Sequence, residues 1–63
     1  MDIELLKRFE GHNVVLLLVG QKWEDSKAVL ITEVHESYIL TREENIAAMI
    51  DPDMIVAVGF EGE

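Results

Sequence analysis

Short apolar segments separated by polar turns constrain this chain more than any other feature of its sequence. They recur at even intervals, and we predict strands at about residues 13–19, 28–34, 37–41, 46–50 and 54–60. The run at residues 14–19 is apolar without alternation, so a strand there needs cover on both faces. Short, evenly spaced strands are typical of a small antiparallel barrel. The sequence therefore predicts an all-β (mainly β) fold, a short N-terminal helix followed by a five-stranded, strongly bent antiparallel barrel.

The segment before Gly11 predicts the helix, over about residues 2–10. Its apolar side chains share one face because they lie three or four residues apart: Ile3, Leu5, Leu6 and Phe9. Asp2 suits the N-cap position, and Gly11 suits the end of the helix. A helix this short is marginal in water by itself, so we expect its apolar face to pack on the strands.

The chain is small and contains no cysteine. Its 63 residues leave room for one domain, and such a domain buries only about 60% of the surface that its unfolded chain exposes. Disulfides are excluded, and His12 and His35 lie too far apart, without thiolate partners, to predict a structural zinc site. Association remains as the means of stabilisation. Because 49% of the residues are apolar, we expect copies of the same chain to cover much of that surface.

The net charge is strongly negative, −8 at pH 7, with Asp plus Glu numbering 13 and Lys plus Arg numbering 5. This charge opposes binding to nucleic acid or to an anionic membrane through a broad basic surface. No apolar run approaches the roughly 20 residues that a membrane-spanning helix needs. The acidic start of the sequence lacks the pattern of a signal peptide. We therefore expect a cytoplasmic protein without a membrane partner.

The layout of the chain and two of its motifs resemble a known family. Residues 11–18, Gly-His-Asn-Val-Val-Leu-Leu-Leu, match a motif in which glycine precedes an apolar first strand. Glu33, His35 and Ser37 lie at the acidic, aromatic-or-histidine and asparagine positions of a second motif. In these motifs and in the order of its elements, the chain is similar to the Sm and Sm-like family, which includes bacterial Hfq.

The chain also departs from the family pattern in its turns. Lys27 stands where the family prefers glycine, and Ser37 replaces asparagine. Asp51 and Pro52 replace a basic residue and a glycine before the last strand. These departures affect the residues of the family's RNA pocket more than they affect the layout of the strands.

The resemblance implies a homo-oligomeric ring in which the last two strands of neighbouring copies pair edge to edge. The fourth and fifth strands carry no charge, and we predict the subunit interface there, at Ile46, Ala48, Ile50, Met54, Val56 and Val58. In the family, one RNA pocket per subunit lies around the pore of the ring. The resemblance therefore implies that single-stranded RNA would bind at His35, Ser37 and Asp51.

Each candidate side chain also has an ordinary structural explanation. His35 is either a surface on which a base stacks or a turn histidine without a ligand. Trp23 is either a further stacking platform for RNA or, as we favour, a side chain packed in the core or at an interface. Asp51 and Asp53 would offer oxygen ligands to a divalent cation, but aspartate beside proline is also ordinary turn chemistry. We predict no metal and no other cofactor.

The sequence offers little support for catalysis. Ser26 and Ser37 lack the Gly-x-Ser-x-Gly context of a nucleophile, and there is no glycine loop that would hold a phosphate. We therefore predict no enzymatic activity, and we favour a ring that binds single-stranded RNA weakly through an atypical acidic pocket. The alternative is a structural or adaptor ring that binds protein partners and has lost RNA binding. A subunit of a larger prokaryotic or phage complex is a third interpretation.

Overall fold

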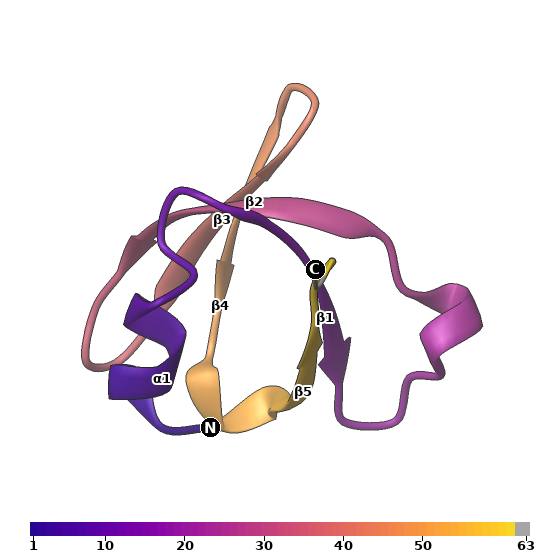
Figure 1. Cartoon of the computed structure of the whole chain (residues 1–63), viewed down its shortest axis with the longest axis horizontal. Helices are drawn as coiled ribbons and strands as arrows, with labels where there is room; N and C mark the ends of the chain where they lie inside the picture. The colour runs from indigo at the N-terminus through magenta and orange to yellow at the C-terminus, as the bar shows by residue number, and fades with distance from the viewer. Residues whose placement is uncertain (62–63) are drawn as a thin grey trace.

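One short helix and five strands follow one another in the order that the sequence predicts. The computed structural model describes residues 1–61. The helix is α1, Ile3–Lys7, and the strands are β1, Asn13–Leu18, β2, Ala28–Val34, β3, Ile39–Glu43, β4, Ile46–Ile50, and β5, Ile55–Gly59. Two 3-10 turns are η1, Trp23–Asp25, and η2, Pro52–Met54. The prediction of a helix followed by five antiparallel strands, mainly β, is thus confirmed (Figure 1).

The helix is shorter than predicted. Asp2 is its N-cap, and Oδ1 of that side chain accepts a 3.0 Å hydrogen bond from the Glu4 amide. Regular helix ends at Lys7, and the chain then continues in turns as far as Gly11. Gly11 has φ of 84°, a left-handed value that glycine adopts without strain, and it redirects the chain into β1.

The third and fifth strands begin later than predicted because turns occupy the first residues of each segment. The His35 amide donates a 2.9 Å hydrogen bond to the Tyr38 carbonyl, which closes a tight turn and delays β3 until Ile39. Met54 belongs to η2, so β5 begins at Ile55.

The strands form one open antiparallel sheet in the order β4-β3-β2-β1-β5. The register pairs Val14 with Val29 and Leu16 with Val58 around the centre of the sheet. β4 and β5, the last two strands in the sequence, are the two edges (Figure 1). Within residues 1–61, neither edge pairs with the other.

Two bulges bend the sheet around its core. In β2 the register slips at Thr32, whose Oγ1 donates a 3.1 Å hydrogen bond to the Leu40 carbonyl, and this slip turns both Ile31 and Val34 inward. In β5 the register slips at Val56, which is left outside the ladder. A bulge adds a residue to one strand, bends it and raises its twist.

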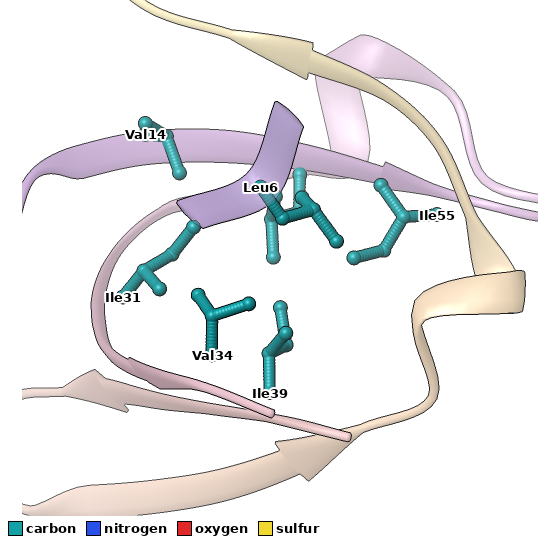
Figure 2. Close-up of a cluster of buried hydrophobic side chains, with 7 residues drawn as sticks. Leu6, Val14, Ile31, Val34, Ile39 and Ile55 are labelled. Carbon is teal, nitrogen blue, oxygen red and sulfur yellow. The ribbon is translucent and has the colours of Figure 1, made fainter. Parts of the chain in front are cut away.

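The core gathers side chains from the helix and from every strand except β4. Its buried members are Leu6, Val14, Leu16, Ile31, Val34, Ile39 and Ile55. Figure 2 shows Leu6 pointing from the helix into the centre of this cluster. Leu6 and its neighbours Ile3 and Phe9 therefore pack on the sheet, as the spacing predicts. The prediction was wrong for Leu5, which is 47% exposed.

Two polar contacts hold the N-terminal segment against the strands. The N-terminal ammonium group donates a 2.8 Å hydrogen bond to the Pro52 carbonyl. A carboxylate oxygen of Glu10 accepts a 2.8 Å hydrogen bond from the amide of Val34.

Across residues 1–61, no helix has the length and apolar character required to cross a membrane.

Candidate functional site

The turns that carry His35, Ser37 and Asp51 lie at the same end of the sheet. Ile39 pairs with both Val34 and Ile50, so the turn between β2 and β3 lies beside the end of β4. Asp51 follows β4 directly. The topology therefore brings these three predicted site residues to one end, and we name it the turn end, residues 35–38 and 51–54.

His35 stacks on Tyr38 within this end. The two ring centroids are 4.6 Å apart with an interplanar angle of 29°. The imidazole Nε2 also lies 2.9 Å from a carboxylate oxygen of Glu33. Tyr38 is a site residue that the sequence reasoning missed. A second ring three residues after His35, across a tight turn, is the signal that would have found it.

The turn end is acidic. Glu36, Asp51 and Asp53 are exposed there, and Glu33 lies beside the histidine. Among the described residues, neither turn carries a lysine or an arginine. The carboxylates there oppose contact with phosphate groups, and the positive charge described at this end is the N-terminal ammonium group on the Pro52 carbonyl.

Asp51 performs a structural task in its turn. One of its carboxylate oxygens accepts a 2.9 Å hydrogen bond from the Asp53 amide, and Pro52 is the first residue of η2. This arrangement is the ordinary turn chemistry that the sequence allows. Among residues 1–61, no group of three or more His, Cys, Asp or Glu side chains is placed to hold a metal ion.

Trp23 lies away from the other candidate RNA residues. Its indole packs on Gly59 at the far end of β5 from η2, so close that a Cβ on that glycine would lie 3.1 Å from Cζ3 of the indole. There it lines a groove of about 900 Å³ together with Phe60 and the segment that follows α1. The structure thus separates Trp23 from His35, Ser37 and Asp51. It also leaves Trp23 49% exposed and outside the core.

The two edge strands expose apolar side chains. On β4, Ile46 and Met49 are each 69% exposed, and Ala48 is exposed between them. The register with β3 puts Ile46, Ala48 and Ile50 on the side of the sheet that faces the core. Nothing within residues 1–61 covers the first two of these, so β4 extends an apolar stripe beyond the core.

The other predicted interface residues differ in their surroundings. Val56, at the bulge of β5, is 58% exposed, and Met54 is exposed in η2. Val58 is partly buried and packs against the core from the same strand. The exposed members of the predicted interface therefore lie on both edges of the sheet.

No family model, no curated protein and no solved structure matches this chain.

Proposed function

We propose that this chain is the subunit of a non-catalytic, homo-oligomeric Sm-like ring, in which β4 of one copy pairs with β5 of the next. The observation that carries the proposal is the pair of uncharged, apolar sheet edges. Natural proteins blunt edges with charge, proline or cover, and an unblunted edge invites another strand. Pairing two different edges is a heterologous contact, which closes into a ring when the rotation between copies allows it.

The strand order supports this assembly. It leaves as edges the last two strands, which are the strands that join neighbours in Sm-like rings. The bulges at Thr32 and Val56 supply the bend that an Sm-like barrel requires. In this proposal the barrel is completed between subunits, since each edge finds its partner on another copy.

The apolar stripes of the two edges match in antiparallel pairing. Ile46 would lie opposite Phe60 and Ala48 opposite Val58, all on the core-facing side. The bulge at Val56 would then let Ile50 reach Ile55. Burying a large apolar side chain stabilises by about 1.5–3 kcal/mol, so exposed Ile46 and Phe60 together supply a substantial driving force.

The charge of the turn end favours a ring that serves as an adaptor for protein partners. Glu36, Asp51 and Asp53 from each copy would collect around the same face of the ring. Such a face repels phosphate and suits a partner with basic side chains.

Weak binding of single-stranded RNA is the second candidate function. The stacked pair of His35 and Tyr38 favours it, because aromatic rings at a surface offer stacking platforms to bases of any sequence. Its acidic surroundings make this binding dependent on cations that screen the carboxylates.

Native mass spectrometry of the purified protein at near-neutral pH and low salt tests the proposal. We expect one closed stoichiometry of roughly five to eight copies, the span that the resemblance to Sm-like rings allows for a closed cyclic assembly. Mass that ribonuclease removes would favour RNA binding, and titration with short single-stranded RNAs in Mg²⁺ would measure it. A ring without RNA supports the adaptor. A monomer at all concentrations overturns the ring.

Two matched variants locate the interface. Val56→Lys places a charge on the β5 edge, and we expect it to dissociate the ring. Leu5→Lys changes another exposed apolar side chain, 47% against 58%, which lies on α1 outside both edge strands, and we expect it to leave the ring intact. A folded Val56→Lys variant that keeps the full assembly mass would exclude this edge as the interface.

A further inference from the structure

A groove beside the C-terminal end of β5 combines aromatic and basic side chains. Its lining includes Arg8, Phe9, His12, Trp23, Phe60 and Glu61, and we name it the Trp23 groove. The rings of Phe9 and Phe60 lie 5.0 Å apart, and Trp23 and Phe60 remain exposed. Among the residues that the structure describes, Arg8 forms no ion pair. In a chain with net charge −8, this exposed cation on an aromatic wall is suited to an acidic, partly apolar occupant.

The turn between β3 and β4 has that character. Its residues 43–46, Glu-Glu-Asn-Ile, form the end of a hairpin that projects from the rest of the fold (Figure 1), and we name them the hairpin tip. Glu44 has φ of 53°, the left-handed region that costs a residue with a side chain about 1–2 kcal/mol. Glycine would avoid that cost. Strain of this kind is a reason to look for a functional contact, here one that uses the exposed Glu44 carboxylate.

The direction of the strands relates the tip to the groove. In antiparallel pairing of β4 with β5 of the next copy, the start of β4 meets the end of β5. The hairpin tip ends at Ile46, the first residue of β4, and the Trp23 groove lies at the end of β5. The tip of one subunit therefore arrives at the groove of its neighbour.

We propose that the hairpin tip of one copy docks in the Trp23 groove of the next, with Glu44 pairing with Arg8 and Ile46 packing on Phe60. This inference rests on the proposed ring. The packing of Ile46 on Phe60 continues its strand ladder, and the pairing of Glu44 with Arg8 adds a second contact outside that ladder. Glu61 also lines the groove and opposes an acidic occupant, so the attraction depends on Arg8. The contact is local and charge-dependent, and each subunit supplies one half of it.

A charge exchange tests the pairing of Glu44 with Arg8. We expect Glu44→Lys and Arg8→Glu each to weaken the contact between subunits about tenfold, because like charges then face each other. The double variant Glu44→Lys/Arg8→Glu should restore assembly, since the two new charges attract across the interface. The single variants change the net charge of the chain in opposite directions, to −6 and to −10. If the single variants acted only through general repulsion between copies, one of them would strengthen assembly and the other would weaken it.

Two further variants separate docking from folding. Glu44→Gly relieves the left-handed strain, so we expect the subunit to melt a few degrees higher while the assembly becomes weaker. Glu36→Lys makes the same charge change as Glu44→Lys at an exposed carboxylate of the turn end. We expect it to leave the subunit contact undiminished.

The measurement is the concentration dependence of assembly, by mass photometry and sedimentation velocity at low salt, with circular dichroism to establish folding. A wild-type monomer would overturn both the ring and the docking. The docking alone is wrong if wild type forms rings that Val56→Lys dissociates, but the single variants Glu44→Lys and Arg8→Glu do not weaken those rings.

Discussion

Leu6 offers the sharpest test of how this small fold is held together. Its side chain is fully buried, with 0% exposure, although it comes from a helix of five residues. Figure 2 shows it among the other buried side chains of the core, including Val14 and Ile55. Leu6→Ala would leave a cavity at the point where the helix meets the bent sheet.

The expected loss is large relative to the stability of the chain. Leu→Ala substitutions in cores cost about 2–5 kcal/mol, and the upper part of that range applies where the surroundings relax little. A folded chain of 63 residues has about 3–9 kcal/mol of stability at typical values per residue. Leu6→Ala is therefore expected to remove at least about a fifth of the stability of an isolated subunit, and in the worst case all of it.

Chemical denaturation of wild type, Leu6→Ala and Leu5→Ala measures this loss. Leu5 is the adjacent helical residue, has the same chemistry and is 47% exposed, so its replacement should cost less than about 1 kcal/mol. Each variant should be measured at several protein concentrations, because assembly raises the apparent stability by mass action. Equal losses for Leu5→Ala and Leu6→Ala, extrapolated to low concentration, would refute the packing of α1 into the core.

Three polar contacts give further predictions. In thermal melts, Glu10→Ala should destabilise the fold by about 1–3 kcal/mol, because the Val34 amide loses its acceptor. Glu10→Gln keeps an acceptor and should cost less. Asp51→Ala should cost about 1 kcal/mol through loss of the cap on η2, and Asp51→Asn should recover most of it. Thr41→Val should change the free energy of unfolding by less than about 1 kcal/mol, because the Thr41 hydroxyl donates only a long 3.4 Å hydrogen bond to the Ala48 carbonyl. A larger loss would show that this bond is stronger than its length indicates.

Local sequence patterns predicted the elements well because each element satisfies its own spacing rule. The i, i+3 and i+4 spacing correctly placed Ile3, Leu6 and Phe9 against the core, but it wrongly assigned Leu5, which is 47% exposed, to the same face. Asp2 was identified correctly as the cap of α1. The run at residues 14–19 was predicted as a strand covered on both faces. Val14 and Leu16 are buried on the core-facing side, whereas Val15 and Leu17 on the other side are only partly buried. What such patterns do not contain is the register between strands.

The bulges show why inward and outward faces could not be assigned from alternation alone. Thr32 and Val56 each add one residue, which shifts the two-residue period, so Ile31 and Val34 both face the core although they lie three residues apart. A slip of one residue reverses the face of every side chain beyond it. The position of Trp23 on Gly59 was unpredictable for a related reason, since it depends on how a loop returns to a strand distant in the sequence.

The distribution of apolar residues links the fold to the proposed assembly. The buried cluster draws on α1, β1, β2, β3 and β5, whereas β4 contributes no buried side chain. β4 is nevertheless uncharged, and its core-facing positions are Ile46, Ala48 and Ile50. A strand that served only as a solvent-facing edge would gain solubility from charge at Ile46 and Ala48 and would lose no packing there, since of these three positions Ile50 alone packs against the core. The composition of β4 is therefore better explained by a surface that another copy buries than by the needs of the isolated subunit, and the hairpin tip at its start carries the charge that would orient this contact.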